Sequence, residues 1–81
     1  MKAIINISLK KGVLDSQGKA AHHTLDNIGF KDAVKDVRIG KQIIMELTTE
    51  DEETARQQVT TMCEQLLANT VIEDFDITLE K

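Results

Sequence analysis

The sequence predicts a small α+β fold that forms one domain over residues 1–81. Strand-like runs with alternating apolar residues open and close the chain, and two helix-like runs with apolar stripes lie between them. A β-rich stretch at residues 36–47 separates the two helices. The resulting order, β-α-β-β-α-β, is that of the ferredoxin-like motif, and right-handed crossovers place both helices on one face of a four-stranded antiparallel sheet.

The first two predicted elements are a strand and a helix. Alternation over residues 2–9 predicts a half-buried strand, although Ile4 lies on its more polar face. Asp15 can cap the helix that follows, because its carboxylate can accept the free N–H groups of the first turn. The apolar stripe of this helix consists of Gly18, Ala21, Leu25 and Ile28. Gly29 supplies the left-handed residue that ends it.

The central stretch predicts a hairpin whose two arms do not align in the simplest register. Val37 and Ile39 share one face of the first arm. The apolar set of the second arm is Ile43, Met45 and Leu47. A two-residue turn at Gly40 and Lys41 pairs Ile39 with Gln42, which splits the two apolar sets between opposite faces. Two alternatives stay open: a loop of odd length with a bulge at Gly40, or a sheet buried on both faces.

The last two predicted elements are a second helix and a closing strand. Thr49 and Glu52 have the spacing of a capping box at the start of the helix, and Asn69 can take the left-handed conformation that ends it. The wide apolar stripe between them consists of Ala55, Val59, Met62, Cys63, Leu66 and Leu67. Residues 71–79 alternate again and predict the last strand.

The size of the chain and its second sheet face together predict self-association. A chain this short buries only about 60% of its unfolded surface, and a single cysteine excludes an internal disulfide. The face that the helices leave open carries Ile4, Asn6, Ser8, Ile44, Glu46, Asp76 and Thr78. Isoleucines among neutral polar groups suit a partner sheet, so we expect self-association through Ile4, Asn6, Ser8, Ile44 and Glu46.

Composition excludes several classes of partner. The formal charge is −4 and the only aromatic residues are Phe30 and Phe75, which argues against nucleic acid. No apolar run approaches the 18 or so residues that span a membrane, and the first residues lack the plan of a signal peptide. The expected location is the cytoplasm.

No catalytic, metal or cofactor site is expected. His22 and His23 are adjacent on a helix and cannot chelate one metal ion, and Cys63 lies within an apolar stripe. The carboxylates of residues 50–53 open a helix as a solvated cap.

Two charged features of the sequence are candidates for binding a ligand or a partner protein. The turn at residues 12–19 precedes a helix and could hold a small anion, although it lacks the spacing of a phosphate loop. Four charged residues near this turn and the hairpin are expected to face a partner: Asp15, Lys19, Arg38 and Lys41.

Three pieces of sequence together resemble the PurS family, the small subunit of phosphoribosylformylglycinamidine (FGAM) synthase. Residues 9–20 (LKKGVLDSQGKA) resemble its first loop and helix, residues 36–41 (DVRIGK) its hairpin, and residues 62–74 (MCEQLLANTVIED) its closing helix and strand. The resemblance covers the whole chain as a single PurS-like domain. The chain departs from the family at Gln42, where an aromatic residue is common, and at Ile44, where an acidic residue is common.

The resemblance implies a non-catalytic accessory subunit that associates with itself as a dimer or a dimer of dimers. In such systems a synthetase that uses ATP and magnesium aminates formylglycinamide ribonucleotide, and a glutaminase subunit releases ammonia from glutamine. The PurS-like subunit helps to assemble these two and to shelter ammonia in transit. Two alternatives rest on the residues alone: a ferredoxin-like regulatory module that binds a small anion, and an independent enzyme that uses Cys63 or the histidines.

Overall fold

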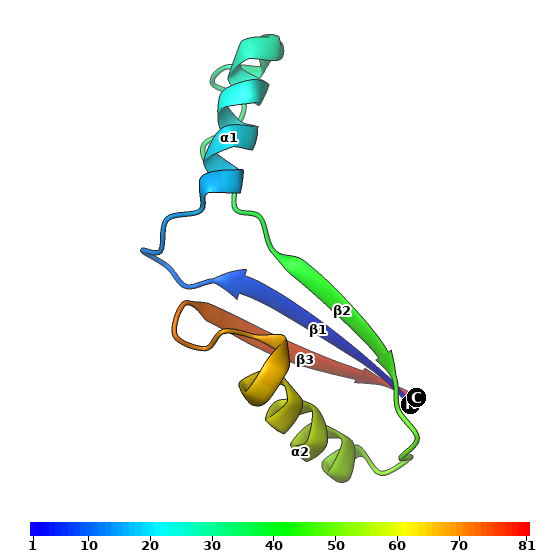
Figure 1. Ribbon diagram of the computed structural model, residues 1–81. Coiled ribbons are helices and arrows are strands. Elements are labelled where there is room, and N and C mark those ends of the chain that lie inside the picture. Colours follow the sequence, from blue (N-terminus) through cyan, green and yellow to red (C-terminus); the bar gives the residue numbers. More distant parts are fainter.

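The computed structural model describes residues 1–81 as three strands and two helices, and each helix runs on into one π-helical turn (Figure 1). In chain order the elements are β1 (Lys2–Leu9), α1 (Ser16–Leu25), η1 (Asp26–Phe30), β2 (Lys41–Glu46), α2 (Glu52–Met62), η2 (Cys63–Leu67) and β3 (Glu73–Glu80). None of these helices combines the length and the apolar content that a bilayer crossing requires.

The sheet has three antiparallel strands in the order β2-β1-β3, so the α+β class is confirmed and the four-stranded sheet is wrong. The strand that the sequence placed at Val37 and Ile39 does not form, and no hairpin turns at Gly40. Because β2 and β3 both run antiparallel to β1, they are parallel to each other, and α2 is the crossover that joins them.

Pairing with β1 removes the register problem of the predicted hairpin. β2 pairs with β1 from Ile7 opposite Lys41 to Lys2 opposite Glu46, which places Ile43 on the same face as Ile5. Neither a bulge nor a doubly buried sheet is needed. Gly40 lies immediately before β2, where an added Cβ would stand 2.7 Å from the carbonyl oxygen of Ile7.

One helix covers one face of the sheet and forms the core with it. Ala3, Ile5 and Ile7 of β1 have at most 2% of their surface exposed, because α2 and η2 pack over them. The buried side chains that the helix contributes are Ala55, Val59 and Cys63. The core is therefore confined to the body, by which we mean β1, β2, β3, α2 and η2.

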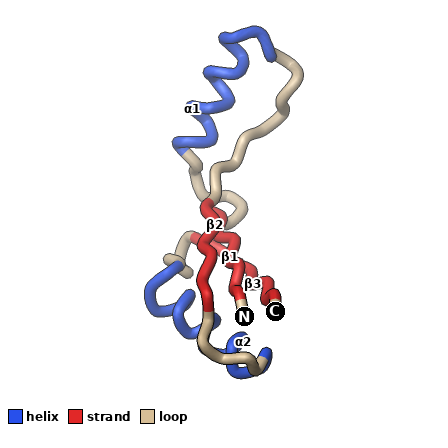
Figure 2. Tube along the Cα trace, turned by 90° about the vertical axis from the view of Figure 1, so that its right-hand side faces the viewer, coloured by secondary structure: helices blue, strands red, loops and turns tan.

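The prediction that both helices cover one face is wrong, because α1 projects away from the body (Figures 1 and 2). We call residues 16–40 the arm: α1 and η1 lead outward, and residues 31–40 return as an extended segment. Since β1 and β2 are antiparallel neighbours, the chain leaves and re-enters the sheet at the same end and needs no crossover. The radius of gyration is 16.2 Å, against about 12 Å for a compact chain of this length.

The helix ends confirm two of the four predicted signals. Asp15 caps α1 and Gly29 is left-handed at a φ of 112°, as the sequence predicts. The predicted capping box at the second helix is wrong: Asp51 caps α2, and its carboxylate accepts from the N–H and the hydroxyl of Thr54. Both hydrogen bonds lower the pKa of Asp51, and the bond from the hydroxyl has the larger effect. Asn69 is not left-handed; its carbonyl oxygen accepts from two N–H groups of the following turn.

A small set of polar contacts, which we call the neck, joins the two ends of the arm. The Oδ1 atom of Asp15 accepts from the N–H of Gly18 at 2.8 Å, and its Oδ2 atom accepts from the N–H of Ile39 at 2.6 Å. The guanidinium of Arg38 donates to the carbonyl oxygens of Val13 at 3.1 Å and Lys10 at 3.3 Å. One carboxylate therefore caps the outgoing helix and holds the returning segment beside it.

The neck keeps the Asp15 carboxylate ionised although its side chain is only 5% exposed. The N–H groups of Ile39 and then Gly18 donate to it and lower its pKa below the usual value, against the opposing effect of burial; the charge of Arg38 acts in the same direction.

Gly18→Ala should destabilise the protein, although alanine is normally the better helix former by about 1 kcal/mol. An added Cβ at this position collides with the carbonyl oxygen of Val37 and comes within 2.8 Å of an Asp15 oxygen. We expect a loss of about 1–3 kcal/mol in the free energy of unfolding, measured with urea. Thr24→Ala, at an exposed position of the same helix, is the control and should cause no loss; equal stability of the two variants would contradict the close approach at Gly18.

Asp15→Asn should lower stability at pH 7 and lose this effect in acid. The folded pKa lies below the unfolded value of about 3.9, so the ionised carboxylate stabilises the fold above that pH, and its contribution disappears as the pH falls through the folded pKa. Urea unfolding between pH 7 and pH 3 should show the gap between wild type and variant closing below about pH 4. A gap that stays constant over this range would show that the charge of Asp15 does not hold the neck.

Candidate functional site

The sheet face away from α2, which we call the open face, carries every residue predicted for self-association. Ile4 lies on β1 between Ile44 of β2 and Thr78 of β3, so it has a side chain on either side. Ile44 is 58% exposed, which is high for a strand residue with a paired neighbour. The residues of the prediction that share this face are Ile4, Asn6, Ser8, Ile44 and Glu46. The structure places them together on one face.

A polar strip crosses the open face beside the isoleucines. Gln42 donates through Nε2 to the Oδ1 atom of Asn6 at 2.8 Å, and Asn6 donates through Nδ2 to Asp76 at 3.2 Å. The three side chains thus link all three strands. The sequence already places Gln42 on this surface with Ile44, but it does not predict the bond to Asn6, because the predicted hairpin pairs Gln42 with Ile39 and not with β1.

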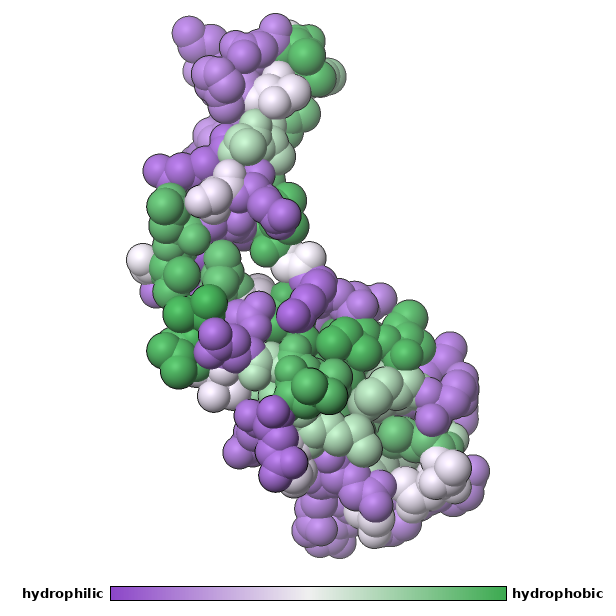
Figure 3. Space-filling model, viewed as in Figure 1, coloured by the Kyte–Doolittle hydropathy of each residue, from purple (hydrophilic) through white to green (hydrophobic).

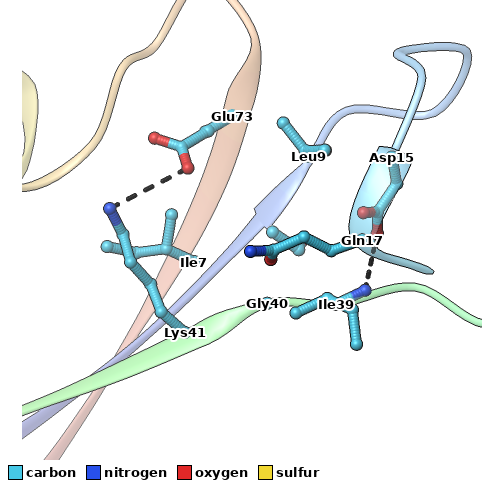
Figure 4. Close-up of a pocket in the computed structure, with 9 residues that line it drawn as sticks. Ile7, Leu9, Asp15, Gln17, Ile39, Gly40, Lys41 and Glu73 are labelled. Carbon is cyan, nitrogen blue, oxygen red and sulfur yellow. Dashed lines mark hydrogen bonds and ion pairs between the residues drawn. The ribbon is translucent and has the colours of Figure 1, made fainter. Parts of the chain in front are cut away.

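The residues predicted to face a partner line two clefts at the neck. Asp15, Lys19 and Arg38 line a cleft of about 290 Å³ between the turn after β1 and the returning segment. Lys41 lines a second cleft of about 210 Å³, where it pairs with Glu73 at 4.0 Å (Figure 4). Asp15 lines both clefts but is itself buried, so its role in the structure is to support their walls.

The neck leaves little for a small anion to bind. The N–H of Gly18, at the start of α1, already donates to Asp15, and Figure 4 shows this carboxylate turned toward Ile39. Arg38 reaches the neck with two guanidinium nitrogens, and both of them donate to backbone carbonyl oxygens. A further anion would meet the negative charge of Asp15, which counts against the regulatory-module alternative.

The groups with potential for chemistry are dispersed. His22 contacts the carbonyl oxygen of Val34 through Nε2 at 2.8 Å, inside the arm, whereas Cys63 is buried in the body. Burial raises the pKa of the Cys63 thiol and so disfavours the reactive thiolate, with Glu64 adding to this effect. No group of three or more His, Cys, Asp or Glu side chains is close enough together to hold a metal ion.

Exposed apolar side chains are concentrated on the arm and around its base (Figure 3). Ile28 and Phe30 near the tip are 63% and 52% exposed, and Leu14 at the base is 64% exposed. Leu66 and Val71, which follow α2, are each 82% exposed. Together with the open face, these surfaces are suited to binding other proteins.

Comparison with known proteins gives a consistent family. The family model of PurS, described as phosphoribosylformylglycinamidine (FGAM) synthase, matches residues 2–81. A PurS subunit of phosphoribosylformylglycinamidine synthase from Synechocystis is 51% identical over 76 residues, which cover 91% of this chain and 75% of that protein.

Solved structures agree with the sequence match. PurS of Methanocaldococcus jannaschii, described as one of the subunits of formylglycinamide ribonucleotide amidotransferase in the purine biosynthetic pathway, superposes with a TM-score of 0.89 at 42% identity, covering 99% of this chain and 95% of that one. A chain in the structure of PurLQS from Thermotoga maritima superposes with a TM-score of 0.85 at 31% identity. The match covers 95% of this chain and 93% of that one. Sequence and three-dimensional structure thus agree over nearly the whole length, and the chain belongs to the PurS family.

Proposed function

We propose that the chain is a non-catalytic accessory subunit of a glutamine-dependent FGAM synthase in the cytoplasm. It helps to assemble an ATP-using synthetase with a glutaminase and assists the transfer of ammonia between them. ATP and magnesium bind to the synthetase in this proposal, and this chain holds no cofactor.

The observation that carries the proposal is the full-length match to PurS, including a chain from a structure described as PurLQS. The surfaces of the molecule support it. The chain exposes apolar side chains on an arm that is not part of the core. An adaptor between two larger proteins needs such binding surfaces and needs no chemistry of its own.

The open face is the surface that we propose for self-association. Ile4 and Ile44 pair at its centre, and the strip of Asn6, Gln42 and Asp76 has its polar groups bonded to one another. These two bonds lower the cost of covering this face with a second sheet. For contacts with the larger subunits we propose Lys19, Arg38 and Lys41 at the neck.

Reconstitution tests the proposed function. Synthetase and glutaminase subunits should form FGAM from glutamine only when this chain is added, because assembly joins the two active sites. With an ammonium salt as the nitrogen donor, the synthetase should form FGAM with or without this chain. FGAM formation is measured with each nitrogen donor, in the presence and in the absence of this chain. Equal glutamine-dependent rates with and without this chain would refute the proposal.

Ile44→Lys should weaken self-association, because it inserts an unpaired charge into the centre of the open face. Light scattering over a concentration series should show a smaller particle than wild type. Gln58→Lys adds the same charge on the exposed side of α2 and should leave the mass unchanged. An unchanged mass for Ile44→Lys would remove the open face from the interface.

A further inference from the structure

The second cleft at the neck, which we call the Lys41 cleft, combines an apolar floor with polar side chains from several elements. It has a volume of about 210 Å³, and no residue of α2 or η2 lines it. Ile7 and Leu9 of β1, with Ile39 of the returning segment, supply its apolar side chains. Pockets for drug-sized molecules measure about 300–1,000 Å³, so this cleft suits a smaller molecule that has an apolar part.

Two side chains of opposite charge meet over this floor. Lys41 of β2 is opposite Ile7 and so lies on the same face of the sheet. Glu73 of β3 is opposite Leu9 and lies on that face too. The Nζ atom of Lys41 and the Oε2 atom of Glu73 are 4.0 Å apart, whereas a charge-assisted hydrogen bond measures about 2.7–2.9 Å. The two groups therefore make no hydrogen bond with each other, and both can bond to a ligand.

The structure fixes Glu73 and leaves room for adjustment at Lys41. The Oε1 atom of Glu73 accepts from the N–H of Asn69 at 2.7 Å, and 18% of this side chain is exposed. The side chain of Lys41 is 54% exposed, so its flexible stem can shift when a ligand enters. Figure 4 shows the amide of Gln17 pointing into the same cleft without a bond to the residues around it. A ligand between these groups therefore meets a fixed acceptor, a movable donor and a free amide.

The charges of the Lys41 cleft determine which kind of ligand it can take. Lys41 contributes one positive charge, and Asp15 and Glu73 contribute two negative charges. Both oxygens of Asp15 already accept from N–H groups of the neck, so the free acceptor is Glu73. A simple anion would leave Glu73 without a partner, and a simple cation would leave Lys41 without one. A small molecule that carries both charges on neighbouring groups can bond to Lys41 and Glu73 together.

We propose that the Lys41 cleft binds a free α-amino acid with an uncharged side chain. The carboxylate of the ligand accepts from Lys41 and from the amide of Gln17, its ammonium group donates to Oε2 of Glu73, and its side chain packs on the apolar floor. Two charge-assisted hydrogen bonds thus replace one long ion pair. The proposal does not rest on the function proposed above. Because Lys41 is also proposed to contact the larger subunits, the tests use this chain without them.

The first test compares three molecules that differ only in their charged groups. L-leucine has both groups, isoamylamine lacks the carboxylate, and isocaproate lacks the ammonium group. In NMR titrations of the wild-type chain at pH 7, L-leucine should shift the backbone amide signals of the cleft and saturate in the millimolar range, since a small ligand must repay its lost freedom of motion. The other two should bind at least about tenfold more weakly, because each lacks one charge-assisted hydrogen bond. Equal binding of the three molecules, or no shift with L-leucine, would overturn the proposal.

The second test removes one charged group of the cleft at a time. Lys41→Met keeps an unbranched side chain without the charge, and Glu73→Gln keeps an oxygen that can accept from Asn69. Each variant should raise the dissociation constant for L-leucine at least about tenfold. Lys31→Met removes the same charge from an exposed position on the arm and should leave the dissociation constant unchanged. Wild-type affinity in either cleft variant would overturn the proposal, and the comparison of ligands on the wild-type chain does not depend on these variants.

Discussion

The shape of this protein depends on one carboxylate shared between two backbone segments. Asp15 accepts from Gly18 at the start of α1 and from Ile39 at the end of the returning segment. A residue that only capped the helix would leave the direction of the arm free. Because the same side chain also holds Ile39, the end of β1 and the start of β2 are fixed together, and α1 is directed away from the sheet. Gly18 permits this, since no side chain fits between the helix and Val37.

This constraint divides the chain into a body that can form a core and an arm that cannot. The core is built from Ile5 and Ile7 against Val59 and Cys63, with one helix over the sheet. So few buried side chains supply little stability, and the single cysteine forms no disulfide that could add to it. The association with other chains that we propose would add to this stability, because a partner that binds only the folded state stabilises it.

Sequence patterns predict the parts of this structure that depend on neighbouring residues. They do not predict the parts that depend on contacts between segments far apart in the chain. The strand alternation around Ile5, the Asp15 cap and the left-handed Gly29 depend on neighbouring residues and are confirmed. The sequence places the cap of the second helix at Thr49, whereas the structure has it two residues later at Asp51.

The predicted hairpin failed for a different reason. Residues 37–39 are as β-prone as a strand, but the N–H of Ile39 donates to a side chain 24 residues earlier, which no periodicity reveals. Within the candidate site, alternation was sufficient to place Ile4 and Ile44 on one face, whereas the bond of Gln42 to Asn6 depends on a strand pairing that the predicted hairpin did not give.

The open face is better suited to a partner than to water. Polar groups on a solvated strand can bond to water and need no fixed neighbours, yet Gln42, Asn6 and Asp76 bond to one another across all three strands. Burying an amide without a partner is costly, and these bonds lower that cost before any contact is made. Ile4 and Ile44 supply the apolar area beside them. We expect a second protein to gain free energy by covering this surface, because isoleucines lie there beside polar groups that are already bonded to one another.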